Sequence, residues 1–362
     1  MKVTIVGAGI YGMCVAHELV SAGHSVTVLD QYDIPNRLCS SYDHHRLIRY
    51  PYGTQTEYAR RVPEAFEAWD QLWASLGRSH FTRTGSLSVG RISGTWFSAS
   101  LSGLAKLEMP YQKMTAPECR EKYPWLEISQ HEIAFETAGC GILGADRILE
   151  SLHALLKTNG VVFETGQRIT SISFDDPSVT TDDGLTYQSD LVVLATGAWH
   201  SHLFPSEIQP IKQTYVLHND VPGFAHIGNG CPIVMDLADD HGFYFVPASD
   251  HLPAKYGNHS ARLRGDPTLQ REVTREEQQG MRALLHTRIP EGLGKSEKFG
   301  SCYYAMTKTE TMALVQSGSV YRLYGGSGNC FKFGPLFSRY LADVIDRKLD
   351  LGRAQRLISG VR

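Results

Sequence analysis

Residues 40–53 read SSYDHHRLIRYPYG, and Arg46 and Arg49 are the side chains in this stretch that are best suited to bind an anion. A planar guanidinium donates two charge-assisted hydrogen bonds to a carboxylate or a phosphate, which makes the binding both strong and oriented. A stretch this rich in polar residues is also typical of a solvated loop. The pattern therefore predicts either an exposed loop or the cationic part of an anion-binding site.

A second candidate cation is Lys332, in the segment GGSGNCFKF near the carboxyl terminus. If FKF is a strand, alternation puts Lys332 opposite Phe331 and Phe333. Apolar residues recur at helical spacing from Leu336 onward, and Pro335 suits the first turn of a helix. The glycine-rich sequence before Lys332 and the helix start after it favour a lysine that faces a site at least as strongly as a surface lysine.

The first thirty residues contain an element that could hold a large ligand. The apolar strand KVTIV leads into GAGIYG, a helical stretch and the strand VTVLD, which ends at Asp30. Gly7 permits a tight turn, Gly9 lets backbone approach a pyrophosphate, and Gly12 lets helix and strand pack closely. The free N–H groups at the helix start attract phosphates, and Asp30 can accept a hydrogen bond from a ribose hydroxyl. The pattern indicates dinucleotide binding and leaves FAD and NAD open.

A later apolar strand, DLVVLATGAW at 190–199, can pass beside a bound dinucleotide at Thr196, Gly197 and Trp199. The alternative is an ordinary buried strand with a glycine at its exit. GxGxxG follows a strand nowhere else in the sequence, so a separate NAD(P)H domain is not expected. The chain would then take its electrons directly from a substrate.

Segments at 84–90, 211–219, 231–236 and 242–249 are alternating and rich in aromatic residues, and no crossover helices accompany them. They predict an antiparallel sheet inserted into the dinucleotide domain. At 362 residues the chain is long enough for two domains. The expected fold class is α/β, an FAD-binding Rossmann-like domain with an inserted antiparallel-sheet substrate domain.

The bulk composition excludes several classes of function. The chain is 42% hydrophobic and 20% charged, with a formal net charge of −3, which argues against nucleic-acid or membrane partners. Its apolar runs are too short to cross a bilayer, and no signal peptide fits the start. Seven scattered cysteines have neither a disulfide framework nor zinc spacing, so we expect a cytoplasmic protein. His44 and His45 have no partners at metal-ligand spacing, and no metal is predicted.

These motifs together give the chain a specific resemblance along nearly its whole length. It resembles the monomeric sarcosine oxidase and N-methyltryptophan oxidase branch of the glycine and D-amino-acid oxidase flavoproteins. Five ordered elements carry the resemblance, namely GAGIYG, SSYDHHRLIRYPYG, ATGAW, the pair KYGNH with SCYYAMT, and GGSGNCFKF. It implies FAD as cofactor and oxidation of a secondary or primary amine bearing a carboxylate, with electrons passed to oxygen to give an imine and hydrogen peroxide. The alternatives are a dehydrogenase with another electron acceptor and a flavin-binding subunit without turnover.

The resemblance also implies roles for individual residues. Arg49, helped by Lys332, would bind the substrate carboxylate, and Arg46 would lie near the flavin ring. Lys255 would activate oxygen, and Cys302 would bond the flavin covalently. His259 matches an active-site histidine, and Tyr244 and Tyr304 would form aromatic walls. The expected cofactor contacts are Gly7, Gly9, Ile10, Tyr11, Gly12, Asp30, Ser40, Ser41, Arg46, Thr196, Gly197, Trp199, Cys302, Gly326, Gly328, Asn329, Phe331 and Lys332.

The sequence departs from the family pattern at two places that would lie beside the reacting groups. Tyr42 replaces a histidine, and Asn329-Cys330 replaces a His-Gly pair, which puts sarcosine as the substrate in doubt. We nevertheless expect Tyr42 in the catalytic group and a monomeric protein. The predicted FAD domain comprises residues 1–78, 139–208 and 300–362, and the predicted substrate domain comprises residues 79–138 and 209–299.

Overall fold

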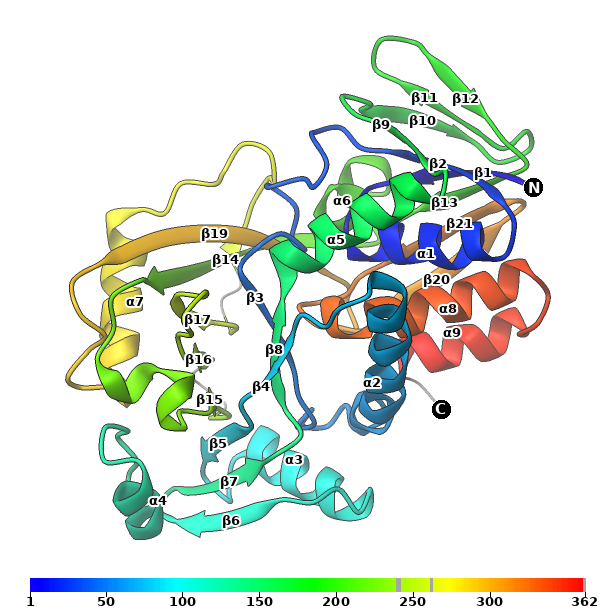
Figure 1. The fold of residues 1–362 in the computed structure, drawn as a ribbon. Helices are drawn as coiled ribbons and strands as arrows, with labels where there is room; N and C mark the ends of the chain where they lie inside the picture. The colour runs from blue at the N-terminus through cyan, green and yellow to red at the C-terminus, as the bar shows by residue number, and fades with distance from the viewer. Residues whose placement is uncertain (239–241, 261–262, 361–362) are drawn as a thin grey trace.

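The structure is a computed structural model that describes residues 1–238, 242–260 and 263–360. Figure 1 shows a parallel sheet with helices packed against it, joined to a long, mostly antiparallel sheet. This arrangement confirms the predicted fold class. Among the described residues, no helix is long and apolar enough to span a membrane.

The parallel sheet has six strands, and all neighbouring pairs except β20 with β21 run parallel. β1 and β13 are buried almost throughout, as expected for central strands that are covered on both faces. In spatial order the strands are β20 (Ala313–Ser317), β21 (Val320–Tyr324), β13 (Leu191–Leu194), β1 (Lys2–Val6), β2 (Ser25–Leu29) and β9 (Val162–Glu164).

Helices cover one face of this sheet, and a small antiparallel sheet covers the other. Pro335 lies in the first turn of α8, where backbone N–H groups have no partner within the helix, so the lack of an N–H on proline costs no hydrogen bond. The helices of the first face, which share one apolar core with β1, are α1 (Ile10–Ser21), α2 (Thr56–Leu76), α5 (Ala145–Thr158), α8 (Gly334–Ile345) and α9 (Leu351–Ser359). The opposite face packs on β10 (Ile169–Ser173), β11 (Ser178–Thr181) and β12 (Thr186–Gln188).

The second large sheet contains every strand predicted for the substrate domain. One pair departs from the expected antiparallel pattern, because β5 and β15 come from different segments of the chain and meet in parallel. In spatial order the strands are β18 (Leu263–Arg264), β14 (Gln209–His218), β17 (Ala254–Asn258), β16 (Phe243–Val246), β15 (Ile233–Asp236), β5 (Ser86–Gly90), β7 (Ile133–Thr137) and β6 (Gln112–Thr115), with β19 (Glu297–Met306) also paired to β14.

A three-stranded sheet links the two halves and carries the arginine-containing stretch. Its strands are β3 (His45–Ile48), β8 (Gly141–Gly144) and β4 (Phe81–Arg83). The remaining helices are α3 (Thr95–Lys106), α4 (Ala116–Lys122), α6 (His200–Leu203) and α7 (Arg275–Arg288), with short 3-10 turns at Gly197–Trp199, Gly223–Ala225, Ile227–Asn229 and Phe331–Phe333. The predicted boundary between residues 299 and 300 falls inside β19, and the division into domains stays a prediction.

Candidate active site

The glycine turn after β1 has the close backbone approaches that only glycine permits. Gly7 has φ +104°, and a Cβ there would lie 2.4 Å from the carbonyl oxygen of Ala195. A Cβ on Gly12 would lie 1.8 Å from the carbonyl oxygen of Gly7. Gly12 therefore lets α1 pack on the turn, as predicted, and it does not line the cavity described below.

Two side chains hold this turn in place. The Asp30 carboxylate accepts hydrogen bonds from the backbone N–H of Ala8 at 2.9 Å and of Tyr32 at 3.0 Å. Ser41 Oγ accepts the N–H of Ile10 at 3.0 Å, so the serine pair reaches the start of α1. Burial raises the pKa of Asp30, although these hydrogen bonds favour its charged form.

One cavity of about 620 Å³ runs from this turn to the second sheet. Gly12 and Tyr42 are the predicted site residues that do not line it. Those that do are Gly7, Gly9, Ile10, Tyr11, Asp30, Ser40, Ser41, Arg46, Arg49, Thr196, Gly197, Trp199, Tyr244, Lys255, His259, Cys302, Tyr304, Gly326, Gly328, Asn329, Phe331 and Lys332. Residues from distant parts of the chain thus meet at a single site.

The glycine-rich segment before α8 forms another backbone wall of the cavity. Gly325 and Gly328 have positive φ values of +81° and +83°, and a Cβ on Gly328 would lie 2.7 Å from the ring of Tyr304. The residues FKF then form a 3-10 turn and not the expected strand. Phe331 stacks near Trp69 and Phe333 near Phe337, so both phenylalanines pack in the helical core. Phe331 and Lys332 also line the cavity.

Two basic side chains in the cavity, the partly buried Arg49 and the buried Lys332, lack a carboxylate partner within the described part of the chain. Arg49 Nη1 is buried without a hydrogen-bond partner, and its guanidinium lies 4.8 Å from the ring centre of Tyr52. Lys332 Nζ donates to Asn329 Oδ1 at 3.1 Å. Burial, followed by the charge of Arg49, holds the pKa of Lys332 well below its usual range. The arrangement is suited to an anionic group of a ligand.

A buried ion-paired group lies at another wall of the same cavity. Asp43 Oδ2 accepts a hydrogen bond from Arg46 Nη1 at 2.8 Å and a second one from Lys255 Nζ. Burial alone would raise the pKa of Asp43, but Lys255 and Arg46 outweigh it and hold the pKa well below its usual range. Sequence reasoning did not assign Asp43, although it is the one acidic residue within residues 40–53.

The other predicted side chains are placed as follows. Tyr244 packs against Gly257 of the neighbouring strand. A Cβ on Gly257 would lie only 2.4 Å from the Tyr244 hydroxyl oxygen. His259 donates its backbone N–H to the Gly242 carbonyl at 2.8 Å. The structure does not bring Tyr42 into the cavity, because the chain turns after Ser41 and the Tyr42 ring faces Arg37 at 6.0 Å.

The cavity also has an apolar wall that sequence reasoning missed. Trp96, Met235 and Leu237 line it and belong to the apolar cluster between α3 and the second sheet. Trp96 packs on Gly53, where a Cβ would lie 2.6 Å from the indole. Gly53, at the end of the arginine-containing stretch, is the one sequence feature that could have indicated an aromatic ring packed against the backbone.

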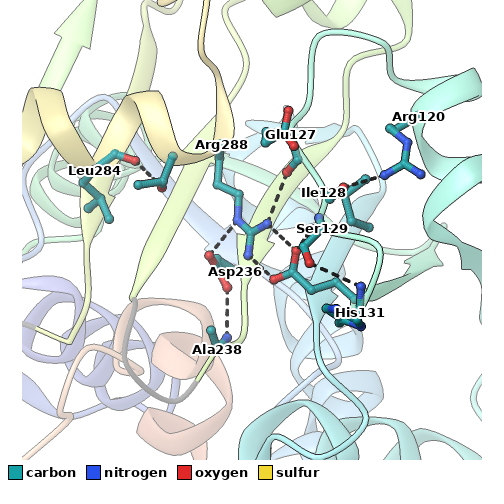
Figure 2. Close-up of polar contacts among 11 residues, drawn as sticks. Arg120, Glu127, Ile128, Ser129, His131, Asp236, Ala238, Leu284 and Arg288 are labelled. Atoms are coloured by element: carbon teal, nitrogen blue, oxygen red, sulfur yellow. Dashed lines mark hydrogen bonds and ion pairs between the residues drawn. The ribbon is translucent and has the colours of Figure 1, made fainter.

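A buried ionic network lies at the end of β15, next to Leu237 of this wall, and Figure 2 shows its polar contacts around Arg288 and Asp236. Arg288 of α7 donates Nε to Asp236 at 2.7 Å and holds Glu132 with two hydrogen bonds. The other oxygen of Asp236 accepts the N–H of Ala238 at 2.9 Å. Because Leu237 and Ala238 both line the cavity, the network anchors the exit of β15 in a defined position.

The donor set fits a dinucleotide that carries a redox-active ring. One part of the cavity offers a side-chain-free glycine turn at a helix start, and another offers cations and aromatic rings. No group of His, Cys, Asp and Glu side chains among the described residues could hold a metal ion. The fold and the cavity together are those of a protein that binds a dinucleotide cofactor.

The chain belongs to the FAD dependent oxidoreductase family, whose profile matches residues 2–344. It is 25% identical to monomeric sarcosine oxidase of Bacillus sp. (strain B-0618), over 99% of this chain and 94% of that protein. It is 23% identical to N-methyl-L-tryptophan oxidase of Yersinia pestis (strain Pestoides F), over 91% and 90% of the two chains. NikD, described as an unusual amino acid oxidase essential for nikkomycin biosynthesis, shares the fold, with a TM-score of 0.83 and 20% identity over 98% and 96% of the two chains.

Proposed function

We propose that this protein is an FAD-dependent oxidase of a secondary or primary amine that bears a carboxylate. Its products would be an imine, which hydrolyses in water, and hydrogen peroxide. The observation that carries the proposal is a pair of basic side chains, the partly buried Arg49 and the buried Lys332, in the cavity that begins at the dinucleotide-binding turn. Oxygen as electron acceptor, a monomeric state and a cytoplasmic location remain predictions.

FAD, when bound, supplies the acceptor for two electrons and the hydrogen of the carbon next to the substrate nitrogen. The residues of this chain orient the substrate for that transfer. Arg49 would grip the carboxylate with two hydrogen bonds, and Lys332 would add a third. The apolar body would lie among Trp96, Leu237 and Tyr244, so the wall favours substrates with a hydrophobic or aromatic side chain.

The proposal is tested by adding candidate amines to the flavin-loaded protein without oxygen and following the flavin absorbance. The panel contains N-methyl, cyclic and primary amino acids with apolar side chains, each paired with the amine that lacks the carboxylate. Bleaching by the acids alone, followed by peroxide on admission of air, is the expected result. Bleaching without peroxide indicates a dehydrogenase. Equal bleaching by both members of the pairs contradicts the carboxylate anchor, and no bleaching by any amine supports a subunit without turnover.

Carboxylate affinity is expected to fall as pH rises, because Lys332 must be charged to bind well. Burial lowers the pKa of the free Lys332 amine, and a bound carboxylate raises it again. Binding therefore takes up a proton in the pH window between those two pKa values. Across that window the Kd of a plain carboxylic acid such as propionate should rise roughly 10–100-fold, the worth of one charged hydrogen bond.

Calorimetric titration at several pH values measures both the Kd and the proton uptake. Lys332→Met is the matched control, and it should bind weakly with no proton uptake from this position. If propionate binds in the cavity of the wild type but its Kd does not change with pH, the proposed role of Lys332 is wrong.

Covalent attachment of flavin through Cys302 is also proposed. Cys302 lines the cavity on β19, and although burial raises the pKa of its thiol, Arg46 and Lys255 oppose the shift. Acid precipitation of the purified protein should leave the yellow colour in the pellet, and the same treatment of Cys302→Ala should release it. Colour in the wild-type supernatant would refute the attachment.

A further inference from the structure

Asp43 is a buried carboxylate that the family resemblance does not account for. Only 3% of its side chain is exposed, against 6% for Lys255 and 18% for Arg46. Oδ2 accepts hydrogen bonds from both cations, and Oδ1 accepts the N–H of His44 at 2.7 Å. Both of its oxygens are thus engaged, and the carboxylate has one defined orientation.

The surroundings of Lys255 leave Asp43 as its one paired carboxylate among the described residues. Arg46 of β3 adds a positive charge, and burial keeps neighbouring His45 neutral by lowering its pKa to about 3. The ring centre of Tyr215 on β14 lies 4.2 Å from Nζ, and Cys302 of β19 contributes a partly buried thiol whose electrostatics Lys255 and Arg46 affect. The side chain of His44, the residue after Asp43, pairs with Asp146 at 3.0 Å.

Lys332 provides a comparison within the same cavity. Both lysines line it and both are buried, but the hydrogen-bond partner of Lys332 is the neutral amide of Asn329. A buried amine without a counter-charge gives up its proton readily, because burial disfavours the ammonium form. Burial also lowers the pKa of Lys255, and there the Asp43 carboxylate opposes the effect.

We propose that Asp43 is a positioning residue whose carboxylate keeps Lys255 in its charged form and holds it at the cavity wall beside Arg46. Lys255 then acts as a fixed cation and hydrogen-bond donor and not as a base. Asp43 also reduces the net charge of the group from two positive charges to one. The effect of Asp43 on the charge of Lys255 does not depend on the proposed function; only the role of charged Lys255 in the reaction with oxygen rests on it.

The test is to measure the titration of Lys255 itself. The full-length protein is prepared with lysine labelled with ¹³C at Cε, and the resonances are assigned with Lys255→Met and Lys332→Met. In the wild type, Lys255 should titrate at a higher pH than Lys332. In Asp43→Asn, the Lys255 midpoint should move to lower pH, toward that of Lys332, while Asp43→Glu should restore it at least in part.

Asp146→Asn is the matched control, because it removes a neighbouring carboxylate that pairs with His44 and not with Lys255. It should leave the Lys255 midpoint in place. A midpoint that does not move in Asp43→Asn, or that moves equally in Asp146→Asn, overturns the proposal. If Asp43→Asn does not fold, the wild-type comparison decides, since a Lys255 midpoint at or below that of Lys332 also overturns it.

The titration needs neither flavin nor an amine substrate, so its outcome is separate from that of the proposed function. In the flavin-loaded enzyme, the reaction of reduced Asp43→Asn with oxygen should slow as pH rises through a range in which the wild type does not change. A slow reaction at every pH, with the Lys255 midpoint unchanged, would assign Asp43 a merely structural part and overturn the positioning role.

Discussion

Arg49→Met is expected to lower kcat/KM for a carboxylate-bearing amine by roughly 10²–10⁴-fold, the largest effect predicted for any single site residue. The substitution removes a two-pronged charged contact in a buried site, which is worth about 3–5 kcal/mol. Among the residues that the structure describes, none is a hydrogen-bond partner of Arg49 Nη1, so this donor is available to the substrate. Steady-state kinetics on the best amino-acid substrate measure the loss.

The matched comparison for this prediction is the corresponding amine without the carboxylate. Its slow oxidation should change little in Arg49→Met, because Arg49 has nothing to bind in that molecule. Arg49→Lys should recover only part of the activity, since an ammonium cannot reproduce the planar fork. Equal losses for the acid and the amine would show that Arg49 supports the fold or the flavin, and the carboxylate anchor would have to be sought elsewhere.

Lys255→Met should slow the reaction of the reduced enzyme with oxygen by roughly 10²–10³-fold, the usual loss when one preorganised charged donor is removed. A fixed positive charge near the reacting ring stabilises the negative charge that develops when oxygen first takes an electron. Reduction by the amine should change far less, because Lys255 is hydrogen-bonded to Asp43 and is not part of the proposed carboxylate anchor of Arg49 and Lys332. Stopped-flow measurement of the two half-reactions separates them.

Lys298→Met is the control for that experiment, because Lys298 lies exposed on β19 and outside the cavity. Its two half-reactions should match those of the wild type. If Lys255→Met slows reduction and reoxidation by the same factor, Lys255 does not act in the oxygen step. If reduced Lys255→Met still reacts rapidly with oxygen, a cation other than Lys255 promotes that reaction.

The glycine turn illustrates which features the sequence alone could predict. Its strand, glycines, helix and acidic end lie within thirty residues, so sterics and local hydrogen bonding determine them together. Gly7 approaches Ala195 and Gly12 approaches the turn, as the spacing predicts. Four strands of the second sheet, β5, β14, β15 and β16, were also recognisable, because alternation of side chains is a local property.

Other features depend on which distant segments meet, and local pattern could not reveal them. FKF reads as an alternating strand, yet it forms a 3-10 turn because Phe331 and Phe333 both find partners in the helical core. Tyr42 stands in a site motif, yet the turn after Ser41 directs it toward Arg37. Trp96 follows an ordinary-looking loop and becomes part of the cavity wall only because α3 packs beside Gly53.

The sequence by itself determined the dinucleotide-binding turn, the two kinds of sheet and the set of cations that could serve a carboxylate. Only the tertiary structure decided how those cations are partnered. Asp43 and Lys255 are 212 positions apart in the chain, and they meet because the fold brings the residues just before β3 next to Lys255 of β17. His45 makes a second contact there, with the carbonyl of Pro253. The strength of a charge pair depends on the distance between the charges and on their burial, and neither quantity can be deduced from the sequence alone.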